Sequence, residues 1–323
     1  MDRRRTLAAL ALGVGTAIGG TAVLAASNPS LPVLRELRWI DPALPRADLV
    51  RVLTTEPREC LLTPGDPTVV DRIAIGRAAF GSPLLLGGQA ARAGISCASC
   101  HRAGRGNPHF VFPGVSGSPG TADVTSSLFS SKRGDGIANP RPIPDLASDP
   151  AKVDRDPASP ALRRFIRGQV VEEFDGLEPS PAVLDGLAAY VRALGGACDG
   201  IVPQSADRDA DAARAAIGAA TRSLAAHDVP TAYLMIAAAR STLGRIDERF
   251  AVVSAIDGRL TARDTELRQV QTMTATDPAA AIAALERWTI RCGRDVLALR
   301  KAESQSLYAS ATLETALMAT GRH

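Results

Sequence analysis

Five consecutive residues, Cys97-Ala98-Ser99-Cys100-His101, constrain this chain more than any other part of its sequence. Two thiols three positions apart lie on the same side of a helical turn, and the imidazole that follows them lies close to that side. The three side chains can therefore hold one large planar group, two by covalent bonds and one by coordination. A chain with such a group folds against the group as well as against itself.

The pattern C-x-x-C-H is the attachment signature of a c-type haem, in which each thiol adds to a vinyl group and the histidine binds the iron. Three other roles of the cysteine pair are weaker. A thioredoxin-like redox pair requires a βαβ context, and a zinc site requires further ligands at short spacing, whereas only His109 lies nearby. A disulfide between residues three apart is rare and closes a short loop. We therefore expect one covalent haem c with His101 as the proximal iron ligand.

The segments on either side of the motif resemble a known family. Gly76 and Phe80 before the motif, and Leu187 and Tyr190 after it, resemble the pair of helices that cross in class I cytochromes c. Residues 69–197 are similar to the haem domains of bacterial cytochrome c peroxidases and MauG-like proteins, which have an LGR-x-LF stretch before S-C-x-x-C-H. The resemblance implies a class I cytochrome c-like domain. In it the glycine lets the helices approach closely, and the three larger side chains fill the contact beside the haem.

The chain departs from this family at the iron. Those peroxidases have two haems, but this chain has a single C-x-x-C-H, and no methionine occurs between His101 and Cys198 to serve as the usual sixth ligand. His109, the only other histidine of the haem domain, is one candidate distal ligand. Met235 is another, although its apolar helical surroundings are more typical of plain core. The third alternative is an open or water-occupied iron position.

Further side chains are expected around the haem. Asn107, Phe110 and Phe112 follow the motif closely and are candidates to line the pocket together with Phe80 and Tyr190. Ordinary loop packing is the alternative for the first three. Because guanidinium groups bind carboxylates in a bidentate manner, the nearby arginines are candidate partners of the haem propionates: Arg102, Arg105, Arg133 and Arg141.

The composition and the apolar spacing predict an all-α chain. Aromatic residues make up only 4% of the sequence, which favours helices over strands. Helices are expected over 69–80, 161–167 and 180–194, the last with Ser180 as its N-cap. Residues 102–160 are instead crowded with Gly, Pro, Ser, Asn and Asp. A stretch of this length without periodicity indicates organisation by a non-protein group.

Residues 205–320 are rich in alanine and periodic almost throughout, with Asp228, Thr261 and Asp277 in capping positions. Three or four helices packed as a bundle are expected there. The chain is therefore predicted to have four parts: a signal peptide or membrane anchor at 1–27, an extended N-terminal arm with one short helix at 28–65, a haem domain at 66–198 and a helical bundle at 205–323.

The N-terminus resembles an export signal. Three arginines precede an uncharged run from Leu7 to Ala26 that ends in small residues suited to signal peptidase. The run is also long enough to remain as a membrane anchor. In both cases the chain crosses a membrane, so we expect a periplasmic protein, free or anchored to the inner membrane. In that oxidising compartment two of the remaining cysteines are expected to pair, either Cys60 with Cys198 or Cys198 with Cys292.

The formal net charge of +3 gives no case for nucleic-acid binding. The sequence predicts a monohaem c-type cytochrome that transfers single electrons to a redox partner protein. The alternative is a peroxidase-like enzyme or a small-ligand-binding haem protein that uses an open iron position. Such an enzyme requires a distal acid–base group, for which Glu172, Glu173 and Asp175 are candidates, although a charged helix end is the simpler interpretation of this cluster.

Overall fold

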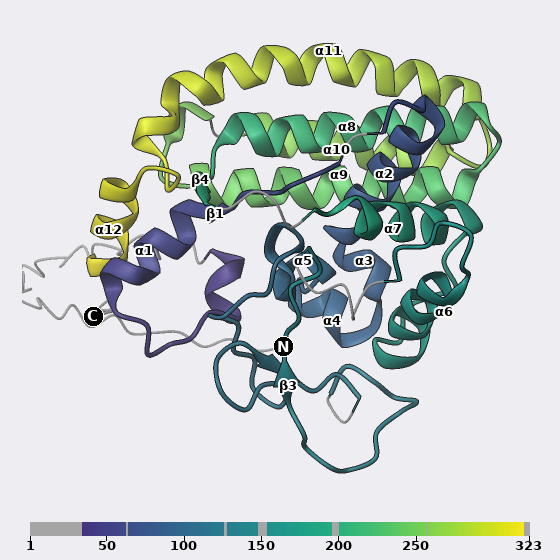
Figure 1. Ribbon diagram of the computed structural model, residues 1–323. Coiled ribbons are helices and arrows are strands. Elements are labelled where there is room, and N and C mark those ends of the chain that lie inside the picture. The colour runs from purple at the N-terminus through teal and green to yellow at the C-terminus, as the bar shows by residue number, and fades with distance from the viewer. Residues whose placement is uncertain are drawn as a thin grey trace, which may run out of the picture. The chain divides into compact units, whose positions relative to one another are not determined.

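Most of the described chain is α-helical. The computed structural model describes residues 34–62, 64–125, 128–147, 154–195, 200–256 and 258–319, which contain twelve α-helices and two small two-stranded sheets (Figure 1). The predicted all-α class is confirmed at this level. The signal peptide or anchor predicted at 1–27 lies outside the described residues. None of the described helices combines the length and the hydropathy needed to cross a membrane.

Helices α2 (Pro67–Phe80) and α7 (Pro181–Ala193) cross at two glycines. A Cβ atom added to Gly76 would lie 1.9 Å from the carbonyl oxygen of Gly186, so the two backbones touch at a distance that only glycine allows. Both helices begin close to the predicted positions, and Ser180 caps α7 by accepting a backbone N–H bond with its hydroxyl. The close approach expected at Gly76 is therefore present.

Short helices between these two carry the cysteine pair. Helices α3 (Pro83–Leu86), α4 (Gly88–Ala93) and α5 (Cys97–Cys100) follow α2. Helix α6 (Ala161–Gly168) begins where the apolar spacing predicted and continues into a π-helical turn, η3 (Gln169–Glu173). Helix α6 packs against α7, so the motif lies within a group of helices that surrounds the α2–α7 crossing.

The chain between α5 and α6 has little regular structure, as predicted. Its described residues contain a 3-10 turn, η2 (Arg102–Gly104), and a two-residue pairing of β2 (Thr121–Ala122) with β3 (Arg141–Pro142). Single backbone contacts connect the rest, such as the bond from the Leu146 amide to the Gly104 carbonyl at 3.0 Å. The segment therefore keeps its shape through individual contacts and not through a repeating ladder.

The arm predicted at 28–65 is partly helical in its described residues. It contains a 3-10 turn, η1 (Arg35–Arg38), and one short α-helix, α1 (Arg46–Thr54). Strand β1 (Thr55–Pro57) follows and pairs in antiparallel fashion with β4 (Ile201–Pro203). This pairing brings together the two chain segments that precede and follow the α2–α7 pair.

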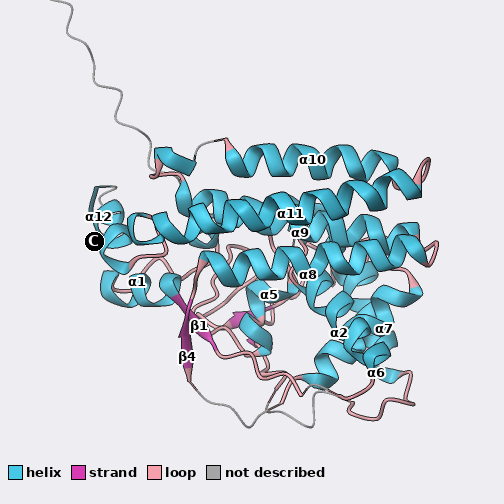
Figure 2. Ribbon diagram, turned by 90° about the horizontal axis from the view of Figure 1, so that it is seen from above, coloured by secondary structure: helices cyan, strands magenta, loops and turns pink. Residues whose placement is uncertain are grey.

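The C-terminal part is a helical bundle, as predicted. In the described residues α8 lies against α9 and α11, and α10 lies against α9 and α11 (Figure 2). Helix α12 instead packs on α1. The bounds of these elements are α8 (Ala206–Ala225), α9 (Val229–Phe250), η4 (Ser254–Ile256), α10 (Arg259–Met273), α11 (Pro278–Ala302), η5 (Glu303–Gln305) and α12 (Ser310–Ala319).

Two of the three predicted helix caps in the bundle are confirmed. Asp228 and Asp277 accept backbone N–H bonds at the starts of α9 and α11, at 3.1 and 2.9 Å. The prediction for Thr261 is wrong, because α10 already begins at Arg259. Gly258, with φ +75°, turns the chain into that helix without a side-chain cap, and Thr261 consequently lies inside the first turn.

One apolar core joins the helices around the motif to the bundle. It includes Trp39, Phe80 and Tyr190 from the first part of the chain and Met235 and Trp288 from the bundle. Trp39 is 6% exposed and Trp288 is fully buried. A smaller core joins α1 to α12. The predicted haem domain and bundle thus share one continuous interior.

Candidate functional site

The cysteine pair occupies a single helical turn, α5, that two serines hold in shape. The backbone N–H of Ser96 donates to Ser99 Oγ at 3.1 Å, and the Ser99 N–H donates to the Ser96 carbonyl at 3.0 Å. Cys97 and Cys100 stand at the ends of this turn and are both free thiols. His101 follows directly and ends the helix. The three side chains singled out by the sequence are therefore neighbours on one turn.

The imidazole of His101 is oriented by the Pro144 carbonyl. Its Nδ1 lies 3.0 Å from this oxygen, so the proton belongs on Nδ1, which donates, and Nε2 is left as an acceptor or metal ligand. Burial lowers the pKa of His101 to about 4, although the Pro144 bond and Asp145 act in the opposite direction. The ring is thus neutral at neutral pH, which is the form that binds a metal.

Two arginines hold the residues that directly follow Pro144. Arg105 Nη1 forms an ion pair with Asp145 Oδ2 at 3.0 Å. Arg155 donates to the Leu146 carbonyl at 2.9 Å and also to three carbonyls at the end of α7. Because one guanidinium bonds both chain segments, it connects the end of α7 to the segment that orients His101.

The two thiols are enclosed by protein but keep accessible surface. Burial raises the pKa of both Cys97 and Cys100 to about 12, so both are protonated at neutral pH. Nevertheless these side chains, like that of His101, are only partly buried. Both are free cysteines, and addition across a vinyl group requires a cysteine that is not in a disulfide.

Of the aromatic residues named from the sequence, Phe80 lies next to the imidazole and Tyr190 packs on the Phe80 ring. The Phe80 ring centroid is 6.2 Å from that of His101 and 5.1 Å from that of Tyr190. The Tyr190 hydroxyl donates to Glu59 Oε1 at 2.7 Å, and the same carboxylate forms an ion pair with Arg77 at 2.6 Å. Burial raises the pKa of Tyr190, and Glu59 adds to this effect. Tyr190 is therefore a neutral donor fixed in one position.

The three loop residues expected to line a pocket differ in what they contact. Asn107 is buried and its Nδ2 donates to the Ser99 carbonyl at 2.8 Å, so it braces α5. Phe110 is fully buried in the core. Phe112 is half-buried and packs on Phe129, with ring centroids 5.2 Å apart. A role beside a haem stays a prediction for all three.

The candidate distal ligands lie in different surroundings. The His109 carbonyl accepts a bond from the Asp41 amide at 2.9 Å, which places this histidine against the N-terminal arm. Burial lowers the pKa of His109, and Arg102 adds to the effect. Met235 is fully buried on α9 within the shared core. Iron ligation by either residue stays a prediction.

Three of the four arginines proposed as propionate partners bind protein groups. Arg102 donates to two carbonyls at the end of α1, at 2.9 and 2.7 Å. Arg105 is paired with Asp145 and Arg133 with Glu172. Arg141 is exposed on β3. Propionate binding stays a prediction for this group.

The acidic residues around η3 separate into two kinds. Glu172 pairs with arginines at the surface and Asp175, with φ +59°, accepts bonds from Ser131. Glu173 is buried at 8% exposure, and its Oε2 has no hydrogen-bond partner within the described part of the chain. The interpretation of this cluster as the charged, solvent-facing end of a helix therefore holds for Glu172 but not for Glu173.

The cysteines outside the motif settle one of the two predicted pairings. Cys60 is disulfide-bonded, whereas Cys292 is a buried free thiol on α11. A bond between Cys198 and Cys292 is therefore wrong. The pairing of Cys60 with Cys198 stays a prediction, because Cys198 lies outside the described residues.

Pro144, Gly186 and Glu59 contribute to the site but were not found from the sequence. Gly186 alone had a local signal, since it directly precedes Leu187 in the helix predicted to face Gly76. The other two act over 43 and 131 residues of chain, across which no pattern connects the partners.

Compared with known family models, curated proteins and solved structures, the chain matches none of them. The site thus consists of two free thiols and a neutral, oriented imidazole on one helical turn.

Proposed function

We propose that this protein is a monohaem c-type cytochrome that transfers single electrons outside the cytoplasm. Its one haem c would be bound through Cys97 and Cys100, with His101 as the proximal iron ligand. The observation that carries the proposal is the 3.0 Å contact between His101 Nδ1 and the Pro144 carbonyl, next to two free thiols. This contact fixes the tautomer that exposes Nε2, which a haem iron requires.

The residues of the site suit an electron carrier. A bound haem supplies a one-electron iron couple, whose potential depends on axial ligands, hydrogen bonds and burial. His101 stays neutral and cannot rotate freely, because Pro144 holds its Nδ1. The Phe80 ring packs beside it and is supported in turn by the Tyr190 ring. A site held this firmly changes little between two oxidation states, which favours exchange of electrons with a redox partner protein in the periplasm.

Covalent haem attachment tests the proposal. We expect the full chain, exported in a host that has a c-type haem attachment system, to carry one haem that survives denaturation. Mass spectrometry of the Cys97–His101 peptide would show the added mass. The double variant Cys97→Ala/Cys100→Ala should lose the haem, while Cys292→Ala, the matched control with a thiol outside the motif, should keep it.

A full-length, folded protein with two free motif thiols after this expression would contradict the proposal. Stoichiometric zinc bound through Cys97 and Cys100 would also contradict it. Both cysteines would then be zinc ligands in their deprotonated form and would not be bonded to a haem.

The second candidate is a peroxidase-like or ligand-binding haem protein with an open iron position. The observation that favours it is the buried Oε2 of Glu173, which has no hydrogen-bond partner in the described residues. A buried carboxylate without a partner is costly unless a ligand or proton satisfies it. In an enzyme of this kind Glu173 would move the proton, and the missing methionine between His101 and Cys198 would leave the iron accessible.

Absorption spectra with and without carbon monoxide or cyanide separate the two candidates. Rapid binding of either ligand would contradict the simple electron carrier and support the open site. A six-coordinate low-spin iron in both oxidation states, lost in His109→Ala, would contradict the open site. The variant Glu173→Gln should change ligand-binding rates only if the second candidate is correct.

A further inference from the structure

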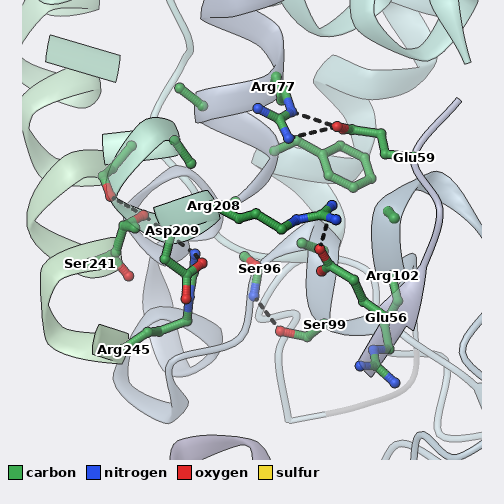
Figure 3. A pocket seen from close by; sticks show the side chains of 18 of the residues that line it. Glu56, Glu59, Arg77, Ser96, Ser99, Arg102, Arg208, Asp209, Ser241 and Arg245 are labelled. Atoms are coloured by element: carbon green, nitrogen blue, oxygen red, sulfur yellow. Dashed lines mark hydrogen bonds and ion pairs between the residues drawn. The ribbon is translucent and has the colours of Figure 1, made fainter. Parts of the chain in front are cut away.

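A cavity of about 420 Å³ lies between α5 and helices α8 and α9 (Figure 3). Its lining includes Ala98 and Ser99, the two residues between the motif cysteines, but not Cys97, Cys100 or His101. The cavity therefore opens on the opposite side of α5 from the thiols. Phe80, Asn107 and Tyr190, the candidates for the haem surroundings, also line it, so the cavity adjoins the proposed haem site without including its three binding side chains. Its volume lies in the range typical of small-molecule pockets.

Charged side chains from several elements converge on this cavity. Six arginines and five carboxylates are among its described lining residues. Arg102 is the arginine of this set that has no ion pair with a carboxylate of the described chain, since it bonds only backbone carbonyls. The other arginines each have one acidic partner: Arg35 with Glu248, Arg77 with Glu59, Arg208 with Glu56, Arg245 with Asp209 and Arg249 with Glu36.

Three of these guanidinium groups have donors left over. Arg102, Arg208 and Arg245 each bond through Nη2 alone, so that Nε and Nη1 have no hydrogen-bond partner among the described residues. An arginine has five N–H donors in a planar fork that matches a carboxylate. In Figure 3 Arg208 extends from α8 toward Glu56, and Arg245 lies beside Asp209 on the same wall. The cavity thus offers unused donors on more than one side.

The charge of Arg102 is incompletely compensated. Its part-buried guanidinium bonds only two backbone carbonyls and pairs with no carboxylate of the described chain. A buried cation with too little opposite charge is stabilised by an added anion. Arg102 is the one arginine by which the lining exceeds its carboxylates, so the net charge of the lining favours an anionic occupant.

Apolar side chains complete the walls. Trp39, Phe80 and Tyr190 contribute aromatic surface on the side of the motif, and Ala216 and Ala238 are among the small residues of α8 and α9 that leave the space open. An inorganic ion would leave this surface uncovered. A molecule with an acidic group at one end and an apolar body would use both kinds of wall.

We propose that the cavity binds a small organic carboxylate, with the acid group on the free donors of Arg102, Arg208 and Arg245 and the apolar body against the aromatic wall. The thiols and His101 are not part of its lining, so benzoate binding can be measured on a variant that carries no haem. Its test is therefore independent of the proposed function.

Calorimetric titration of the full chain with benzoate, and with benzyl alcohol as the neutral control, tests the site. We expect benzoate to bind and benzyl alcohol to bind at least about tenfold more weakly, since the charge-assisted bonds are lost. Arg208→Gln and Arg245→Gln should each weaken benzoate binding about tenfold or more. Arg268→Gln, an exposed arginine on α10 outside the cavity, should leave it unchanged.

Equal affinity for benzoate and benzyl alcohol, or no binding of benzoate, would overturn the proposal. Binding of inorganic phosphate in preference to benzoate would overturn the assignment to a carboxylate with an apolar body. Circular dichroism establishes whether each variant is folded. If Arg245→Gln is unfolded, Arg208→Gln provides the test. The Arg208 side chain is 42% exposed, so its replacement should leave the fold intact. The Cys97→Ala/Cys100→Ala variant should bind benzoate as the parent does.

Discussion

The helical bundle and the irregular segment after the cysteine pair keep their shapes by opposite means. In the bundle, capped helices satisfy their own backbone groups and pack around residues such as Trp288. In the irregular segment, single side chains hold the backbone: Asn107 braces α5, and Arg155 connects the Leu146 carbonyl to the end of α7. The bundle distributes its stability over many equivalent contacts, whereas the irregular segment depends on a few that have no substitute.

Glycine substitutions should give the largest effect, and they compare the bundle with the α2–α7 crossing, to which Arg155 connects the irregular segment. In Gly76→Ala the new methyl group would meet the Gly186 carbonyl at 1.9 Å, and we expect a loss of about 4 kcal/mol or more in the free energy of unfolding. Gly293→Ala on α11 is the matched control, because no atom lies within 4 Å of its added Cβ. It should gain up to about 1 kcal/mol. Urea denaturation followed by circular dichroism measures both.

A Gly76→Ala protein as stable as the parent would show that α2 and α7 can separate without cost. The contrast between the regions would then be lost, because the crossing would tolerate change as readily as an exposed helix position does.

Removal of one guanidinium should have the next largest effect. Arg155→Ala leaves carbonyls at the end of α7 and the Leu146 carbonyl without their donor, and we expect a loss of about 3 kcal/mol from charge-assisted bonds. The haem-loaded variant should also have a shifted reduction potential, since the segment that orients His101 loosens. Arg300→Ala, an exposed arginine of α11, should change neither measurement. An unchanged potential in Arg155→Ala would restrict that residue to a structural role.

A conservative change in the shared core distinguishes packing from ligation. Met235 is fully buried on α9, so Met235→Leu should cost less than about 1.5 kcal/mol and leave the absorption spectrum of the haem unchanged. Loss of a thioether ligand would instead alter the spectrum in both oxidation states. The same sample serves for denaturation and for spectroscopy. A spectral change without loss of stability would identify Met235 as a ligand supplied by the bundle.

Removal of a helix N-cap in the bundle should give the smallest loss of stability. Asp277→Ala removes the acceptor at the start of α11 and should cost about 1 kcal/mol. Thr261→Ala is the control, because α10 begins before this residue and uses no side-chain cap. Equal losses in the two variants, measured by thermal unfolding, would show that Thr261 acts as a cap after all.

The bundle could be predicted from the sequence because its determinants are local. Apolar periodicity located its helices, and Asp228 and Asp277 marked two of their starts. The predicted start of α10 at Thr261 was wrong because Gly258, in a left-handed conformation, is the N-cap residue and forms no side-chain cap. The pattern of side chains in the sequence does not show where the backbone adopts such a conformation.

Only the local part of the candidate site could be predicted in the same way. The pattern from Cys97 to His101 is contiguous, so the sequence displays it directly. Pro144 acts through a backbone carbonyl, which any residue has, and Glu59 reaches Tyr190 only once the chain has folded. The cavity likewise depends on arginines such as Arg208 and Arg245 that the sequence does not set apart from the surface arginines.

The two tryptophans of the chain report separately on the bundle and on the surroundings of the cysteine pair. The Trp39 ring lies 3.9 Å from the position of a Cβ added to Gly94, close to the start of α5. Trp288 is enclosed in the bundle, where its Nε1 donates to the Arg263 carbonyl at 3.1 Å. A haem absorbs where tryptophan emits, so attachment next to α5 would quench Trp39 more than Trp288. The fluorescence that remains would then follow the unfolding of the bundle alone.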